Sequence, residues 1–176
     1  MKKIFSILAF LFIFNAASAA SKDEINARVS EALKTFEFEV PAGFNLSKKS
    51  SGYLVFPNVV KAGLGIGGEY GEGALIVDGR IVDYFSVASA SIGFQLGVQS
   101  RSQIILFMNS EVLNSFRKSE GWKAGVDASV AVASLGSGGS IDSEVLNRPI
   151  IGFIFSGKGL MYNLTFEGSK ITKINK

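Results

Sequence analysis

The chain has 176 residues, of which 47% are hydrophobic, with 18 basic and 15 acidic side chains and neither cysteine nor histidine. The lack of cysteine excludes disulfides, thiol catalysis, thiolate metal sites and the acylated cysteine of a lipoprotein. The lack of histidine excludes serine–histidine nucleophile pairs, histidine general bases and histidine-bound zinc. We therefore expect a protein that is not an enzyme, with no catalytic residue, no metal site and no cofactor.

Residues 1–19 have the pattern of a secretory signal peptide. Two lysines, Lys2 and Lys3, precede the apolar run Ile4–Phe14, and Ala17-Ser18-Ala19 fits the A-x-A cleavage pattern. The run is shorter than the roughly 20 residues of a membrane-spanning helix, which disfavours the alternative of an uncleaved anchor. Cleavage after Ala19 predicts one domain, residues 20–176, in the periplasm or otherwise exported.

Removal of Lys2 and Lys3 with the signal leaves the remaining chain close to neutral. A neutral chain is a poor partner for nucleic acid, because such binding depends on neutralising phosphates. Any attraction to an anionic membrane must then come from a local patch of basic residues. The densest basic stretch contains Lys48, Lys49 and Lys61. These lysines could simply form a solvated surface without a ligand. If they have a binding role, contact with anionic lipid headgroups is the expected one.

Residues 21–38 lack glycine and proline and predict an amphipathic helix. Ser21 can cap it, and apolar residues recur at helical spacing, at Ile25, Val29, Leu33 and Phe36. Pro41 and Gly43 are expected to end the helix. The helix could lie on a membrane surface or pack on a sheet, and one narrow apolar stripe favours packing.

Beyond Gly52 the pattern changes to short strands and turns. Asp78-Gly79 is the strongest hairpin signal, and a short helix is expected at Glu111–Ser119. The expected strands are Tyr53–Phe56, Leu64–Tyr70, Ala74–Val77, Arg80–Phe85, Ala88–Val98, Ile104–Met108, Lys123–Ser134, Ile150–Phe155, Leu160–Phe166 and Lys170–Ile174. Short links predict mostly antiparallel pairing. The fold class is α+β: a glycine-rich twisted sheet or partly closed barrel, with an N-terminal helix and one short helix within the β region.

Ala88–Val98 alternates most regularly. Its even positions, including Ile92, Phe94 and Leu96, are apolar, whereas its odd positions are small or amide-bearing. This uncharged strand is our candidate surface for a lipid tail. Trp122, the single tryptophan, is a further candidate, although aromatic residues more often fill cores.

Other motifs favour plain interpretations. Gly63, Gly65 and Gly68 match G-x-G-x-x-G, but no helix signal follows, so a glycine-rich strand is the better interpretation. Glu69 and Asp127 are candidate carboxylates for an enzyme acting on lipid or glycan, a third hypothesis that the lack of histidine and cysteine makes the weakest.

An ordered series of segments resembles the SYLF domain family. The series begins at Gly52–Gly63, continues through Gly67–Ala74, Ser89–Gly97, Leu106–Met108, Gly121-Trp122 and Ala124–Asp127, and ends with Gly157–Leu164 and Glu167–Ile174. The resemblance implies a lipid-binding domain whose amphipathic N-terminal helix, here residues 22–38, takes part in membrane contact. Eukaryotic members bind phosphoinositides and some bind actin filaments, whereas exported bacterial members are often lipoproteins, a class from which this cysteine-free chain departs.

The leading hypothesis is an exported, periplasmic, non-catalytic protein that binds a phospholipid or related amphiphile and associates with anionic membrane surfaces. Its expected site combines Lys48, Lys49 and Lys61 near the headgroup with Ile92, Phe94, Leu96 and Trp122. The alternative is a structural or interaction module of the cell envelope that binds a protein partner. The oligomeric state is left open by the sequence.

Overall fold

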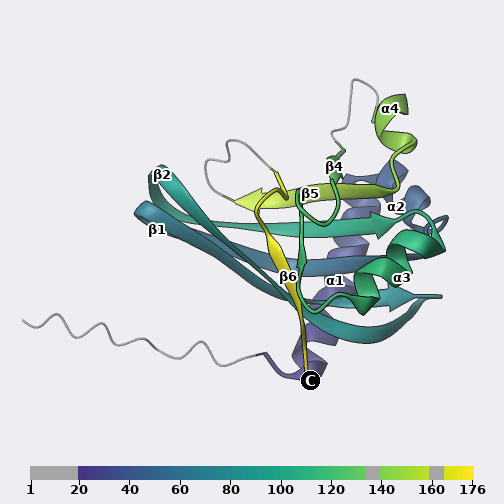
Figure 1. Ribbon diagram of the computed structural model, residues 1–176, viewed down its shortest axis with the longest axis horizontal. Coiled ribbons are helices and arrows are strands. Elements are labelled where there is room, and N and C mark those ends of the chain that lie inside the picture. Colours follow the sequence, from purple (N-terminus) through teal and green to yellow (C-terminus); the bar gives the residue numbers. More distant parts are fainter. Residues whose placement is uncertain (1–19, 134–138, 159–164) are drawn as a thin grey trace, which may run out of the picture.

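The computed structural model describes residues 20–133, 139–158 and 165–176, without the side chains of residues 64–66, 91–96 and 158. Four helices and six strands lie in these ranges: α1 (Lys22–Glu39), α2 (Pro41–Ser47), β1 (Gly52–Val77), β2 (Arg80–Phe107), α3 (Ser110–Lys118), β3 (Trp122–Lys123), β4 (Ala131–Val132), α4 (Ser143–Leu146), β5 (Ile150–Lys158) and β6 (Lys170–Ile174). The α+β class is confirmed: a mostly antiparallel half-barrel sheet has α1 on one side and α3 on the other (Figure 1).

The N-terminal helix is confirmed. The Ser21 Oγ accepts a hydrogen bond of 3.2 Å from the Glu24 N–H, and Asp23 and Glu24 complement the helix dipole in the first turn. The helix ends at Glu39, before Pro41 as expected, and a second helix, α2, follows at once. Pro41 begins α2, because its fixed φ and missing N–H suit the first turn of a helix.

The two longest strands, β1 and β2, each join several strands expected as separate. They are linked by Asp78-Gly79, whose φ values of 50° and 72° give the expected tight hairpin turn. β1 continues through Pro57 by means of a register shift between Phe56 and Val59, where no ladder N–H is needed. The paired strands therefore form one long ribbon that bends instead of stopping (Figure 1).

The ribbon folds across itself where glycine permits close contact. A Cβ atom added to Gly73 would lie 2.0 Å from the Val55 carbonyl oxygen, and one added to Gly71 would lie 2.8 Å from the Asn58 carbonyl oxygen. Only glycine allows two backbones to approach this closely. This crossing curves the sheet into a half-barrel.

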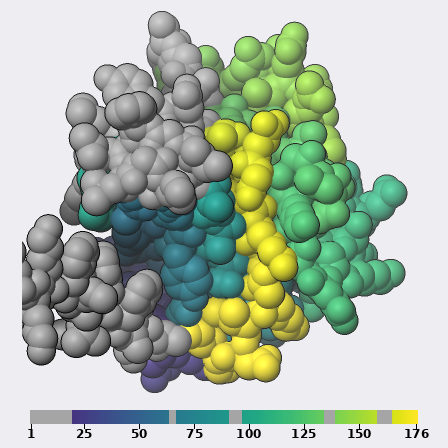
Figure 2. Space-filling view, turned by 60° about the vertical axis from the view of Figure 1, so that its left-hand side comes forward, coloured from purple at the N-terminus to yellow at the C-terminus, as the bar shows by residue number. Residues whose placement is uncertain are grey.

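β2 is the central strand. Its first part pairs with β6 and its last part with β5, while β1 pairs along its length. Ile104–Phe107 is fully buried, as predicted for a strand covered on both faces. β6 in turn pairs with β3, so it lies as a narrow strip between the ribbon and the segment around α3 and β3 (Figure 2). The order is β3-β6-β2-β5-β4.

The expectation of one alternating strand over Lys123–Ser134 was wrong. Only β3 and β4 form there, and a turn separates them. Gly125 has a φ of 85°, and the Asp127 carboxylate accepts a hydrogen bond of 2.5 Å from the Lys123 N–H. A hydrogen bond from the backbone to a nearby side chain therefore stabilises a turn here, in place of the strand-to-strand hydrogen bonds of a continuous strand. The strand expected over Leu160–Phe166 falls largely on 159–164, outside the described residues, and β6 matches its prediction.

Two apolar cores cover the two faces of the sheet. On the concave face, α3 and the β3 segment cover a core whose members include Leu54, Phe56, Phe85, Phe107, Phe116, Trp122 and Phe166. On the convex face, α1 covers a second core, whose members include Ile25, Val29, Phe36, Val55, Ile104 and Phe153. The helix stripe expected from the sequence thus packs on the sheet.

Candidate functional site

A groove of about 420 Å³ lies where α1 meets the ribbon and the end of β5. Its lining is mostly polar, with residues from both helix and strands: Arg28, Glu31, Ala32, Thr35, Pro57, Asn58, Ser100, Arg101, Ser102 and Ser156. Such a lining supplies hydroxyl, amide and guanidinium donors and one carboxylate, that of Glu31, beside apolar surface from residues such as Ala32 and Pro57. The groove therefore suits a polar, anionic group better than an acyl chain.

Arg101, which lines the groove, belongs to a largely buried ion network. The Arg101 Nη2 lies 2.6 Å from the Glu69 Oε2, and the Lys61 Nζ lies 3.4 Å from the Glu69 Oε1. The side chains of Lys61, Glu69 and Arg101 are only 13%, 8% and 5% exposed. With the Gln103 amide turned so that its oxygen faces the guanidinium, that oxygen accepts from Arg101 Nε and Nη2 at 3.0 and 3.2 Å. One carboxylate thus holds two cations, which leaves this corner with a net positive charge.

The α1 wall brings a second arginine to the groove. Arg28 pairs with Glu24 one turn earlier at 2.5 Å, and its side chain is 50% exposed. A half-exposed guanidinium can change partner at little cost, because an exposed ion pair contributes at most about 1 kcal/mol. Arg28 is therefore the more available of the two arginines.

The opposite rim comes from the ribbon and β5. The Ser102 Oγ donates to the Pro57 carbonyl oxygen at 2.8 Å, which fixes the register shift of β1 beside the groove. Ser156 has a φ of 51° and donates from its N–H and Oγ to the Glu39 carboxylate at 3.0 and 2.9 Å. Glu39 ends α1, so these two bonds join the helix to β5 and fix the width of the groove.

The predicted lysines are not brought together. Lys61 belongs to the buried network, in which Lys61 and Arg101 both pair with Glu69. Lys48 and Lys49 lie exposed at the end of α2, where the Lys48 Nζ is 4.3 Å from the centre of the Phe44 ring. They form a separate basic surface.

The predicted apolar contacts are also dispersed. Trp122 is 4% exposed and packs edge-on against Phe116, 5.8 Å between ring centres, in the concave core. Ile92, Phe94 and Leu96 lie in β2, but their side chains are outside the described residues. Val98, two residues after Leu96, is 72% exposed, and Val60 and Tyr70 are exposed elsewhere on the same ribbon.

Carboxylates considered for catalysis have structural partners. Glu69 binds two cations, and Asp127 stabilises a turn. In the described parts of the chain, no group of three or more metal-ligating side chains is placed to hold an ion. None of the described helices is both long and apolar enough to cross a membrane.

Sequence reasoning missed the two arginines. Arg101 had a signal: it is the single charged residue between Asp83 and Glu111, in a stretch whose other residues are apolar, small or uncharged polar. Arg28 had none, because an arginine on the polar side of an amphipathic helix is ordinary. The groove exists because α1 packs across β1 and β2, which a local pattern does not reveal.

A half-barrel that carries a polar groove beside a buried ion network defines a binding module. The model of one family, described as Ysc84: Las17-binding protein actin regulator, matches residues 88–176. The chain belongs to this family, the Ysc84 (SYLF) domain family, and the resemblance found in the sequence is confirmed. The family is in general a non-catalytic binding module associated with lipid binding. No curated protein matches the chain.

Proposed function

We propose that this chain is an exported, periplasmic, non-catalytic protein that binds the headgroup of an anionic phospholipid in the groove between α1 and the ribbon. The observation that carries this proposal is the pairing of a polar groove of about 420 Å³ with two arginines, Arg28 and Arg101. Membership in a family associated with lipid binding supports the same ligand class.

The chemistry of the groove fits a phosphate diester. Guanidinium groups bind phosphate through parallel hydrogen bonds and stay charged at any physiological pH. Arg101 is held in place by Glu69 and Gln103, so little side-chain entropy is lost when it binds. Arg28 closes the site from the helix by exchanging its exposed partner Glu24 for the ligand. Serine hydroxyls at the rim match the glycerol part of a headgroup.

The acyl chains would lie along the outer surface of the ribbon. Ile92, Phe94 and Leu96 remain our candidates for this contact, with exposed Val60 and Val98 on the same ribbon supporting it. Lys48 and Lys49 would add attraction to the anionic surface, about 1 kcal/mol for each lysine close to it. We leave Trp122 in the core, since lipid contact would require the concave core to open.

The export part of the proposal depends on residues 1–19. They combine two lysines, an apolar run and an A-x-A site, so cleavage after Ala19 would release residues 20–176 as one SYLF-like domain. With no cysteine available for acylation, its membrane contact would be reversible.

The test is flotation of the protein, purified from cells that express the full chain, with vesicles of phosphatidylglycerol or of phosphatidylcholine. We expect flotation with the anionic vesicles alone, reduced about fivefold or more by Arg28→Ala. The matched control is Lys34→Ala, which removes the same charge from an exposed position of α1 outside the groove. Equal losses in both variants would argue for unspecific attraction. No flotation and no lipid carried through purification would reject the proposal, and a stable protein partner without lipid would favour an interaction module.

A further inference from the structure

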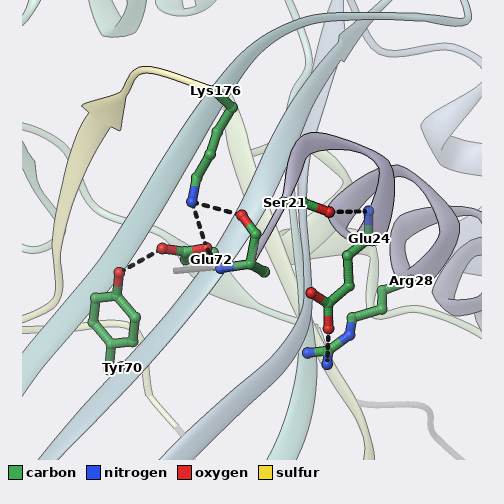
Figure 3. A network of polar contacts seen from close by, with 7 residues as sticks. Ser21, Glu24, Arg28, Tyr70, Glu72 and Lys176 are labelled. Carbon is green, nitrogen blue, oxygen red and sulfur yellow. Dashed lines mark hydrogen bonds and ion pairs between the residues drawn. The ribbon is translucent and has the colours of Figure 1, made fainter. Parts of the chain in front are cut away.

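A second polar cluster lies at the start of α1, and Arg28 of the groove appears in the same view (Figure 3). The Glu72 carboxylate is its centre. Its Oε1 accepts from the Tyr70 hydroxyl at 2.9 Å, and its Oε2 accepts from the Lys176 Nζ at 3.0 Å and from the Ala20 backbone N–H at 3.2 Å. The Lys176 Nζ also donates to the Ala20 carbonyl oxygen at 2.8 Å. Both backbone groups of Ala20 are thus bound.

The Glu72–Lys176 pair in this cluster is largely shielded from water, whereas Tyr70 is half-exposed. The side chains of Glu72 and Lys176 are 11% and 9% exposed, and Ala20 packs against the convex core. Burial opposes ionisation of Glu72, but hydrogen bonds from Lys176 and Tyr70 prevail, so the pKa of Glu72 is below its ordinary value. Glu72 is therefore a buried, charged acceptor that already faces the nitrogen of Ala20.

Ala20 is also the residue that follows the expected cleavage site. Hydrolysis of the Ala19–Ala20 amide by a protease of the export machinery adds water across that bond. The hydroxyl goes to the Ala19 carbonyl carbon, the proton goes to the Ala20 nitrogen, and at neutral pH the products are a carboxylate and an α-ammonium group. The Ala20 nitrogen then changes from a single amide donor into a cation with three donors.

We infer that Glu72, supported by Tyr70 and Lys176, is a binding site for the α-ammonium group of Ala20 in the processed chain. This inference rests on the export part of the proposed function. The arrangement repeats the one at Glu69, where one buried carboxylate holds two cations. Asp23 and Glu24 in the first turn of α1 offset the unfavourable position of a cation before a helix N-terminus.

The contacts of Ala20 indicate which peptide bond is cleaved, namely Ala19–Ala20. Cleavage one residue later, after Ala20, would also follow a small residue, but it would remove the residue that Glu72 and Lys176 hold. Cleavage precedes folding during export, so the free ammonium group enters the site as α1 docks. The charge created by processing then fastens the first turn of α1 to β1 and to Lys176.

The first measurement is the intact mass and N-terminal sequence of the protein exported from cells that express the full chain. We expect a chain that begins at Ala20. A chain that begins at Ser21 would overturn the inference and leave export standing. A chain that retains residues 1–19 would overturn both.

The second measurement is the rate at which the α-amine of the exported protein reacts with an amine reagent at pH 7, where lysines remain protonated. Because pairing with Glu72 favours the protonated, unreactive form of the α-amine, we expect the reaction to be about three- to tenfold slower than in Glu72→Gln. Tyr70→Phe keeps the carboxylate and should accelerate the reaction less. The control is Glu37→Gln, which removes an exposed carboxylate near the opposite end of α1. Equal rates in wild type and Glu72→Gln would overturn the inference.

Discussion

Two ion pairs of nearly equal length allow the effect of burial on stability to be measured within this one chain. Glu69–Arg101 is 2.6 Å long with side chains 8% and 5% exposed, whereas Glu24–Arg28 is 2.5 Å long with side chains 46% and 50% exposed. Glu69 additionally compensates Lys61 at 3.4 Å. We therefore expect Glu69→Gln to destabilise the fold strongly and Glu24→Gln to do so weakly.

The magnitude follows from the environment of the charges. Removing one partner of a buried pair costs about 3–5 kcal/mol, because the remaining charge stays buried without compensation. Glu69→Gln leaves two such cations. An exposed pair contributes about 0–1 kcal/mol. In a domain of this size, each kcal/mol lowers Tm by about 2–4 °C, so the buried substitution should lower Tm by about 6–20 °C.

The assay is urea unfolding followed by the fluorescence of Trp122, the single tryptophan, which is buried in the concave core. A free-energy loss for Glu69→Gln within about 0.5 kcal/mol of that for Glu24→Gln would refute the reasoning. The double substitution Glu69→Gln with Arg101→Met should recover part of the loss, since it removes one of the two stranded cations. No recovery would mean that Arg101 stabilises by packing instead of by charge.

Three further outcomes are expected. Gly73→Ala places a Cβ 2.0 Å from the Val55 carbonyl oxygen, so it should cost at least about 1–3 kcal/mol in urea unfolding, and a neutral result would show that the ribbon crossing is looser than described. Ser21→Ala removes the N-cap of α1 and should cost about 1 kcal/mol by the same assay, whereas an unchanged midpoint would mean that water replaces the cap. Because the pKa of Glu72 is lowered on folding from its ordinary value of 4.5, its contribution is complete above pH 4.5 and is lost as the pH falls through the folded value. The stability difference between wild type and Glu72→Gln should therefore shrink on acidification below pH 4.5, and a constant difference would exclude this linkage.

Local patterns were sufficient where the physical cause is itself local. The cap and apolar stripe of α1 depend on residues within a few turns, and Asp78-Gly79 forms its turn because these residue types tolerate positive φ. The buried strand Ile104–Phe107 was recognisable because a run with no polar residue has no exposed face. These features establish the α+β class and most of the strands.

Length and path of the strands were decided by pairing. Pro57 interrupts a strand in sequence, but Ser102 on β2 bonds its carbonyl oxygen and the ladder resumes at Val59. Conversely, Lys123–Ser134 alternates in sequence yet makes a turn, because Asp127 offers the backbone a closer partner than any strand does. Alternation of apolar and polar residues indicates which side chains would share one face of a strand. It does not indicate whether another strand lies alongside to pair with that segment.

The sequence by itself excluded the chemistry of cysteine and histidine side chains. It also indicated the family to which the chain belongs and the charged residues that a ligand could meet. Only the tertiary structure decided which charges meet. Arg28, Arg101 and Ser156 are far apart along the chain and line one groove because α1 lies across the sheet. Ala20, Glu72 and Lys176 meet because β1, β6 and the start of α1 converge at one end of the sheet. Contacts between residues so distant in sequence arise from packing of the two cores, which depends on all the elements at once.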